Sequence, residues 1–161
     1  MSRGNTILVS GYHAGRRMTG TITGTPKPGT VMQIDLSETI DTNNRFTWEV
    51  FTTSDGVRPW SGFPVLLEKP GSGFLMTRAY VTLEQCEVYY PLHGDELNMI
   101  VADDASTTTE DHSFGDKYMV DSGTGKLINP SSEESEPFTG LEGVTNQSDD
   151  YLMHCMYTGN H

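Results

Sequence analysis

The sequence predicts an all-β protein in which short antiparallel strands form a small barrel or sandwich. The first observation is a repeated pattern in which a Gly-Asp or Gly-rich turn precedes a short apolar run, at 94–95, 115–116 and 122–125. Glycine and aspartate tolerate the backbone angles of tight turns, so each such pair marks a reversal of the chain. The second observation is the alternation of apolar residues within the runs, a period of two that is typical of half-buried strands. The third is that no amphipathic helical pattern exceeds two turns.

Turn residues divide the chain into a series of strand candidates. In chain order we expect strands at 21–23, 31–36, 46–51, 64–69, 74–90, 96–101, 117–121, 126–129 and 151–157. Apolar side chains share one face in several of them: Met32, Ile34 and Leu36; Phe46, Trp48 and Val50; Leu97, Met99 and Val101; Tyr118 and Val120; Tyr151, Met153, Cys155 and Tyr157. Within 74–90 the alternation changes phase between residues 83 and 86, which predicts a bulge or a strand break. The polar stretches 103–113 and 129–136 are expected to be loops.

The length of 161 residues predicts one domain with an appended arm. We expect residues 1–17 to form an extended N-terminal arm and residues 18–161 a single all-β domain, with an acidic β-meander at 92–159. The core is thin, because Leu, Ile, Val and Phe total only 33 residues. Such a chain would gain stability by burying more surface against a partner.

Charge is distributed very unevenly along the chain. Residues 81–161 contain sixteen of the twenty-two carboxylates and only two basic residues, Lys117 and Lys126. Nucleic acid is therefore not expected as a partner, because phosphate contacts need clustered Lys and Arg. An anionic membrane surface is disfavoured for the same reason. No apolar run approaches a membrane span, and the first residues do not have the pattern of a signal peptide, so we expect synthesis in a cytoplasm.

The two cysteines, Cys86 and Cys155, lack the C-x-x-C spacing of a metal or redox pair. Two buried thiols are the favoured interpretation for a cytoplasmic product, and a disulfide is the alternative. Acidic residues of the 103–111 stretch (Asp103, Asp104, Glu110 and Asp111) could bind calcium, but their spacing matches no recognised loop. The histidines lack the paired spacing of a zinc site. We expect no cofactor and no resident metal.

One run, Met119-Val120-Asp121-Ser122-Gly123-Thr124, resembles the active-site loop of aspartic proteases. That chemistry needs two aspartates that share one proton, so this chain would have to act as a homodimer through Asp121. The favoured interpretation is a hairpin turn between strands at 117–121 and 126–129.

Aromatic residues suggest a second alternative, a carbohydrate-binding module. Trp48 and Trp60, with Tyr89 and Tyr90, could form a platform on which a sugar stacks. Trp48 fits a core position better because it lies on an alternating strand. Trp60 fits an exposed interface anchor better.

Four runs in the second half share a pattern with a known group of proteins. They are H-G-D-E-L-N-M-I-V-A at 93–102, F-G-D-K-Y-M-V-D-S-G-T-G-K-L-I at 114–128, E-P-F-T-G-L-E at 136–142 and D-Y-L-M-H-C-M-Y-T-G at 150–159. In this pattern the segment from Leu92 to Gly159 resembles the small decoration proteins (cement or head-stabilising proteins) of tailed-bacteriophage capsids. The resemblance implies a compact β-barrel or β-tulip that clusters as trimers on the outer shell.

The leading hypothesis is therefore a non-enzymatic virion protein that binds the outer surface of a phage capsid and bridges neighbouring capsid subunits. The expected partners are the major capsid protein and further copies of this chain in a homotrimer. A homodimeric aspartic protease and a carbohydrate-binding adhesion module are the alternatives. Candidate interface residues lie in the arm and in the loop around residue 60: Ile7, Val9, Tyr12, Arg16, Arg17, Arg58 and Trp60.

Overall fold

The computed structural model describes residues 7–10, 16–35, 37, 40–52, 62–69, 78–102, 110–129, 136–147 and 150–159. Within these residues the chain forms thirteen strands, which confirms the predicted all-β fold class. They are β1 (Leu8–Ser10), β2 (Arg17–Ile22), β3 (Met32–Ile34), β4 (Phe46–Val50), β5 (Val65–Leu66), β6 (Gln85–Tyr89), β7 (Glu96–Val101), β8 (Glu110–His112), β9 (Lys117–Val120), β10 (Leu127–Ile128), β11 (Phe138–Gly140), β12 (Val144–Gln147) and β13 (Tyr151–Tyr157).

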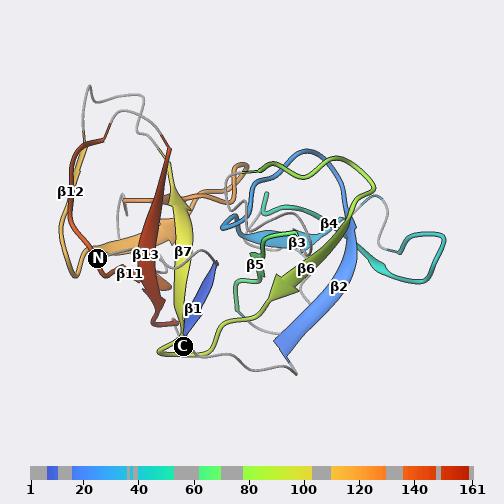
Figure 1. The fold of residues 1–161 in the computed structure, drawn as a ribbon, viewed down its shortest axis with the longest axis horizontal. Helices are drawn as coiled ribbons and strands as arrows, with labels where there is room; N and C mark the ends of the chain where they lie inside the picture. The colour runs from blue at the N-terminus through green and yellow to red at the C-terminus, as the bar shows by residue number, and fades with distance from the viewer. Residues whose placement is uncertain are drawn as a thin grey trace.

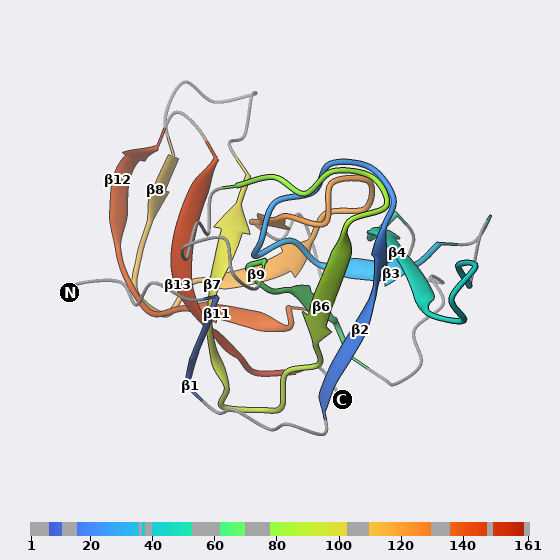
Figure 2. The ribbon, with the colours of Figure 1, turned by 45° about the vertical axis from the view of Figure 1, so that its right-hand side comes forward.

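Five strands of the second half form a closed ring, which we call the acidic barrel. The strand order is β7-β10-β9-β11-β13, and β13 pairs again with β7. Strand β1 adds to this sheet along β7, and β8 and β12 form a separate two-stranded ribbon. Figure 1 shows the labelled strands of this half on the left of the molecule, and Figure 2 shows β8 and β12 side by side at its edge.

The alternating residues of the acidic barrel face its interior as the sequence predicts. Leu97, Met99 and Val101 of β7 are fully buried, and so are Met153 and Cys155 of β13. These two strands are antiparallel along their whole length, from Tyr151 opposite Val101 to Met156 opposite Glu96. The aromatic rings of Tyr118, Phe138 and Tyr157 complete the same core cluster. Side-chain burial on one face therefore fixes the register of the barrel.

Strands β2 to β6 form a second, five-stranded sheet whose two ends approach each other, and we call it the second barrel. Its strand order is β3-β4-β2-β6-β5. An antiparallel bridge between Val31 and Val65 joins its two ends, and Met32 N–H donates to Pro64 O at 2.8 Å. The second barrel has its own core, built from Ile22, Met32, Ile34, Trp48, Leu66, Tyr80, Cys86, Val88 and Tyr90.

The two barrels share a continuous interface. Val31, Phe51, Val65, Leu67 and Tyr89 come from the second barrel but pack into the core cluster of the acidic barrel. The backbone also crosses this interface: Ile100 N–H donates to Gly29 O at 3.1 Å, and Val31 N–H donates to Gly125 O at 2.8 Å. The Tyr89 hydroxyl donates to the buried Asp95 carboxylate at 2.6 Å. Apolar packing and paired polar groups together make the two barrels one packed body.

Strand pairing departs from the prediction in two places, because β2 pairs with β4 and β7 pairs with β10 in parallel. Gly20 permits the first of these pairings. A Cβ at this position would overlap the Phe46 carbonyl oxygen and the Trp48 ring, so only glycine lets β2 and β4 approach so closely.

Several segments differ from their expected structure, and β1, β11 and β12 form where no strand was expected. Residues 110–112 were expected in a polar loop but form β8, which pairs with β12. The buried side chain of His112 explains this, because its Nδ1 lies 2.9 Å from the Tyr118 hydroxyl inside the fold. The long strand expected at 74–90 begins only at Gln85 in the described residues, because the chain turns at 82–83 and Leu83 has a φ of 71°. The predicted break between 83 and 86 is therefore confirmed as a turn.

Candidate interaction surface

Three large apolar side chains are exposed on the second barrel, and we call them the apolar tip. Leu83 is 73% exposed, Val81 55% and Ile40 53%. Val81 and Leu83 belong to the turn before β6, and Ile40 forms a bridge with Phe46 at the start of β4. In Figure 1 the turn and the loop before β4 both lie on the side of the second barrel that points away from the acidic barrel.

Contacts with β2 bring the two parts of the apolar tip to the same end of that strand. Thr21 donates its hydroxyl hydrogen to the Asp41 carboxylate at 3.2 Å, next to Ile40. Leu83 N–H donates to the carbonyl oxygen of Ile22 at 2.8 Å. Because Thr21 and Ile22 are consecutive, the loop that carries Ile40 and the turn that carries Leu83 flank one strand end.

The turn at 81–84 is held in one conformation by hydrogen bonds. Glu84 N–H donates to Val81 O at 3.0 Å, and Val81 N–H donates to the Glu84 carboxylate at 2.9 Å. Thr82 exchanges two hydrogen bonds with the backbone of Gly24, through its hydroxyl group. The left-handed backbone of Leu83 costs about 1 to 2 kcal/mol for a residue with a Cβ, so these bonds hold a strained residue in place. An ordered apolar turn loses little conformational entropy when it binds.

Two basic side chains lie beside the carboxylate of Glu84, the acidic residue of the 81–84 turn. The Lys69 ammonium group pairs with the Glu84 carboxylate, and Arg78 lies 3.6 Å from the same oxygen. The hydrogen bond from Lys69, and after it the one from Val81 N–H, holds the pKa of Glu84 below its ordinary value. Glu84 therefore stays ionised and keeps the turn in place at neutral pH.

The two barrels differ strongly in charge. On the second barrel Arg17, Arg45 and Lys69 each pair with a carboxylate of the same barrel. The described residues from 91 to 159, which form the acidic barrel and the β8–β12 ribbon, hold nine carboxylates and two basic residues, Lys117 and Lys126. The apolar tip thus lies on the charge-balanced barrel, and the excess negative charge lies on the other.

The structure places Ile7 inside the fold, which corrects its assignment as an interface residue. Its side chain is fully buried in the core of the acidic barrel. Its N–H donates to the Glu68 carboxylate at 3.0 Å, and its carbonyl oxygen accepts from Asn98 N–H at 2.7 Å. Strand β1 pairs with β7 of the same chain, so this part of the expected arm belongs to the barrel. Val9 is 37% exposed and is still accessible.

Arg16 and Arg17 of the expected arm contact their own chain. Arg17 lies on β2, and its guanidinium group is 2.8 Å from the Glu87 carboxylate. Arg16 donates through Nε to Tyr90 O at 3.2 Å and lies 5.8 Å above the Tyr90 ring. Tyr12, Arg58 and Trp60 lie outside the described residues.

The expected sugar platform does not form from the residues that the structure describes. Trp48, Tyr89 and Tyr90 are all fully buried, which confirms the core assignment of Trp48 and corrects the platform. Their rings fill the barrel interiors, so no face is open to a sugar.

The hairpin interpretation of the Asp121 run is confirmed. Strands β9 and β10 pair antiparallel with Leu127 opposite Val120, and Asp121 N–H donates to Lys126 O at 2.8 Å across the turn. The Asp121 carboxylate accepts a hydrogen bond from the Thr124 hydroxyl within this turn.

Both cysteines are buried free thiols, as the favoured interpretation has it. They lie in different core clusters, Cys86 in the second barrel and Cys155 in the acidic barrel. In the described part of the chain no group of three or more His, Cys, Asp or Glu side chains is placed to hold a metal ion. Asp103 and Asp104 of the calcium hypothesis lie outside that part, and Asp111 lies on β8.

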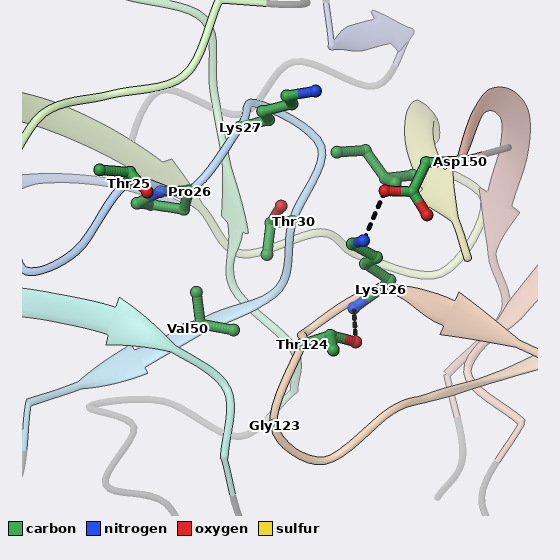
Figure 3. A pocket seen from close by; sticks show the side chains of 10 residues that line it. Thr25, Pro26, Lys27, Thr30, Val50, Gly123, Thr124, Lys126 and Asp150 are labelled. Carbon is green, nitrogen blue, oxygen red and sulfur yellow. Dashed lines mark hydrogen bonds and ion pairs between the residues drawn. The ribbon is translucent and has the colours of Figure 1, made fainter. Parts of the chain in front are cut away.

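A pocket of about 310 Å³ opens where the two barrels meet. Its lining comes from the loop before β3, the end of β4, Ile100 of β7, the β9–β10 hairpin and Asp150. Figure 3 shows Lys27 at its rim and Lys126 directed toward Asp150. The Lys126 ammonium group pairs with the Asp150 carboxylate.

Comparison with known proteins gives no family for this chain: no protein-family model and no curated protein sequence matches it. Among the described residues no helix has the length and hydropathy needed to cross a bilayer.

Sequence reasoning did not find the apolar tip. Val81 and Leu83 are two positions apart, so they fit one face of the long strand expected there, and Ile40 is a lone apolar residue in a polar stretch. The one feature of the sequence that indicated it was the change of phase in the apolar alternation between residues 83 and 86. This change predicts a turn, and a turn exposes the apolar residues that it carries.

Proposed function

We propose that this chain is a non-enzymatic decoration protein that binds the outer surface of a tailed-phage capsid and stabilises it by bridging neighbouring capsid subunits. The observation that carries the proposal is the separation of an ordered apolar tip on one barrel from the excess negative charge of the other. The apolar tip faces the capsid, and the acidic barrel faces solvent.

The apolar tip has the properties of an interface anchor. Leu83 and Val81 are exposed, close together and fixed by backbone hydrogen bonds. Burial of a side chain of this size in a partner's pocket contributes about 1.5 to 3 kcal/mol. Binding energy is usually concentrated in a few such residues near the centre of an interface.

The excess negative charge fits the opposite, solvent-facing role. Copies that are arrayed densely on a shell stay soluble when their outer surfaces repel one another. This role requires the charge to lie away from the contact with the shell, and it is supported by the position of the acidic barrel on the opposite side of the molecule from the turn and loop that carry the apolar tip (Figure 1).

The resemblance to decoration proteins falls on one structural unit. The four runs at 93–102, 114–128, 136–142 and 150–159 contain the five strands that close the acidic barrel. This supports the proposal, because the shared pattern coincides with a complete barrel rather than with scattered segments. Trimer formation is part of the proposal, and light scattering on the purified protein measures it.

The test mixes purified protein with empty heads of the cognate major capsid protein and measures co-sedimentation. Leu83→Asp places a charge at the most exposed position of the apolar tip, so we expect it to abolish binding to the heads. The matched control is Phe114→Asp on the acidic barrel, because Phe114 is also 73% exposed but belongs to the turn between β8 and β9. The control should bind as the unmodified protein does.

Three outcomes contradict the proposal in different ways. Failure of the unmodified protein to co-sediment with the heads removes the capsid as partner. Equal binding by the Leu83→Asp variant removes the apolar tip from the interface. Loss of binding with Phe114→Asp alone reverses the proposed orientation.

A further inference from the structure

The pocket between the two barrels combines an apolar floor with a cationic rim. Pro26, Val50 and Ile100 contribute apolar surface, while Lys27 and Lys126 contribute ammonium groups. Its volume of about 310 Å³ is that of a small ligand site. No contact of the proposed capsid interface uses these residues, so the inference is independent of the proposed function.

Thr30 places a hydroxyl group in this pocket. The residue is only 3% exposed, and no hydrogen bond of its hydroxyl group to another described residue is present. A Cβ at Gly125 would lie 2.8 Å from the Thr30 methyl carbon, so the methyl group packs against the Gly125 backbone. This packing fixes the side chain, and Figure 3 shows its oxygen turned into the pocket. The hydroxyl oxygen is not among the fully buried side-chain atoms of the described residues that lack a partner, so it is accessible from the pocket and can donate a hydrogen bond to a ligand there.

The charges at the rim favour an anion. Lys126 is one of only two basic residues after residue 80, and it lies in this pocket with Lys27. Asp150 pairs with Lys126 and holds its ammonium group at the rim. Lys27 has no ion pair with a described residue, so the lining keeps one excess positive charge in a chain whose net charge is −12.

We propose that this pocket binds a carboxylate group carried on a short aliphatic stem, the chemistry of a glutamate side chain. The carboxylate accepts a hydrogen bond from the Thr30 hydroxyl group and is attracted by the Lys27 and Lys126 ammonium groups. The stem packs on Pro26, Val50 and Ile100. Such a ligand has two sources, an acidic segment of a protein or a free small carboxylic acid.

The experiment titrates the full chain with glutarate, with a hexaglutamate peptide and with inorganic phosphate, and follows backbone amide signals by NMR. We expect saturable shifts at Thr30, Gly125 and Lys126 with the two carboxylates. Thr30→Val keeps the methyl packing and removes the hydroxyl group, so it should weaken binding about tenfold. Lys27→Met should weaken binding severalfold. Because the Lys27 side chain is exposed, this substitution should leave the fold intact. The matched controls are Thr19→Val on the outer side of β2 and Lys117→Met on β9, which should bind as the unmodified protein does.

Each outcome has a defined meaning. Tighter binding of hexaglutamate than of glutarate supports the proposal with a protein segment as ligand, and equal binding supports it with a small acid as ligand. Absence of saturable shifts with both carboxylates overturns the proposal. Unchanged affinity in both Thr30→Val and Lys27→Met also overturns the proposal. Tighter binding of phosphate than of glutarate overturns the claim that the ligand needs an aliphatic stem.

Discussion

Gly125 joins the two barrels, and its replacement by alanine is the sharpest test of how they are held together. The residue has a φ of 63°, and its carbonyl oxygen accepts the hydrogen bond from Val31 N–H at 2.8 Å. An added Cβ would overlap the Val31 carbonyl oxygen and lie 3.1 Å from a Val50 methyl carbon. The overlapping atom belongs to the backbone, so relief requires the hairpin to move away from the second barrel.

The expected cost follows from three contributions. A left-handed backbone costs about 1 to 2 kcal/mol for alanine relative to glycine. Displacement of the hairpin weakens the Val31 to Gly125 hydrogen bond, which contributes about 1 kcal/mol. Overpacking against Val50 and Thr30 adds about 1 kcal/mol or more. We therefore expect Gly125→Ala to lower the free energy of unfolding by about 3 kcal/mol or more.

Urea denaturation followed by far-UV circular dichroism and tyrosine fluorescence measures this loss. Gly123→Ala is the matched control, because Gly123 lies in the same turn with a φ of 113° and a Cβ there would meet no atom within 4 Å. The Gly123→Ala control should lose only the free energy that a positive φ costs alanine. We argue that glycine is required at 125 because of the contact across the interface, and not only because of local backbone strain. If Gly125→Ala loses no more stability than Gly123→Ala, this argument is refuted.

The remaining predictions concern the core, the thiols and the pH dependence. Ile7→Ala should destabilise the protein by about 2 to 5 kcal/mol in urea denaturation because Ile7 is fully buried, whereas the exposed Val9→Ala should change stability by less than about 0.5 kcal/mol; equal effects would contradict the position of Ile7 in the core. Burial raises the pKa of Cys86 to about 12 and also raises that of Cys155, so neither thiol should react with Ellman's reagent at pH 8 in the folded protein and both should react in denaturant; rapid labelling of the folded protein would contradict this. The N–H of Arg45 lowers the pKa of Asp41, with further hydrogen bonds from Asn43 N–H and Thr21, so the stability that ionised Asp41 provides is present above the ordinary aspartate pKa and is lost as the pH falls through the lowered value. Asp41→Asn should therefore reduce stability at neutral pH and converge with the unmodified protein in acid, and a constant difference across that range would exclude the ionised carboxylate as the cause.

Local patterns in the sequence predicted the strands with one buried face. Leu97, Met99 and Val101 alternate with residues of the opposite face, and the structure buries all three in the barrel that the alternation implies. The β9–β10 hairpin was predictable from its glycine-rich turn, because such residues predict a reversal of the chain.

Features that depend on distant partners could not be predicted. The parallel pairing of β2 with β4 depends on Gly20 lying beside Phe46 and Trp48, which no local pattern reveals. His112 looks polar in sequence, yet its contact with Tyr118 buries it and turns a predicted loop into a strand. Ile7 lies within the predicted arm, and only the pairing of β1 with β7 shows that it belongs to the core.

Ring closure has a consequence for how such molecules crowd together. In the described part of the chain, each of the five strands of the acidic barrel has hydrogen-bonded neighbours on both sides, so the main-chain groups of this barrel are largely unavailable for pairing with a strand of another copy. Other protein molecules that contact the outer face of the barrel therefore contact side chains and not unpaired main-chain groups. A single exposed substitution can therefore change the surface that a neighbouring molecule contacts, without any rearrangement of the strands beneath.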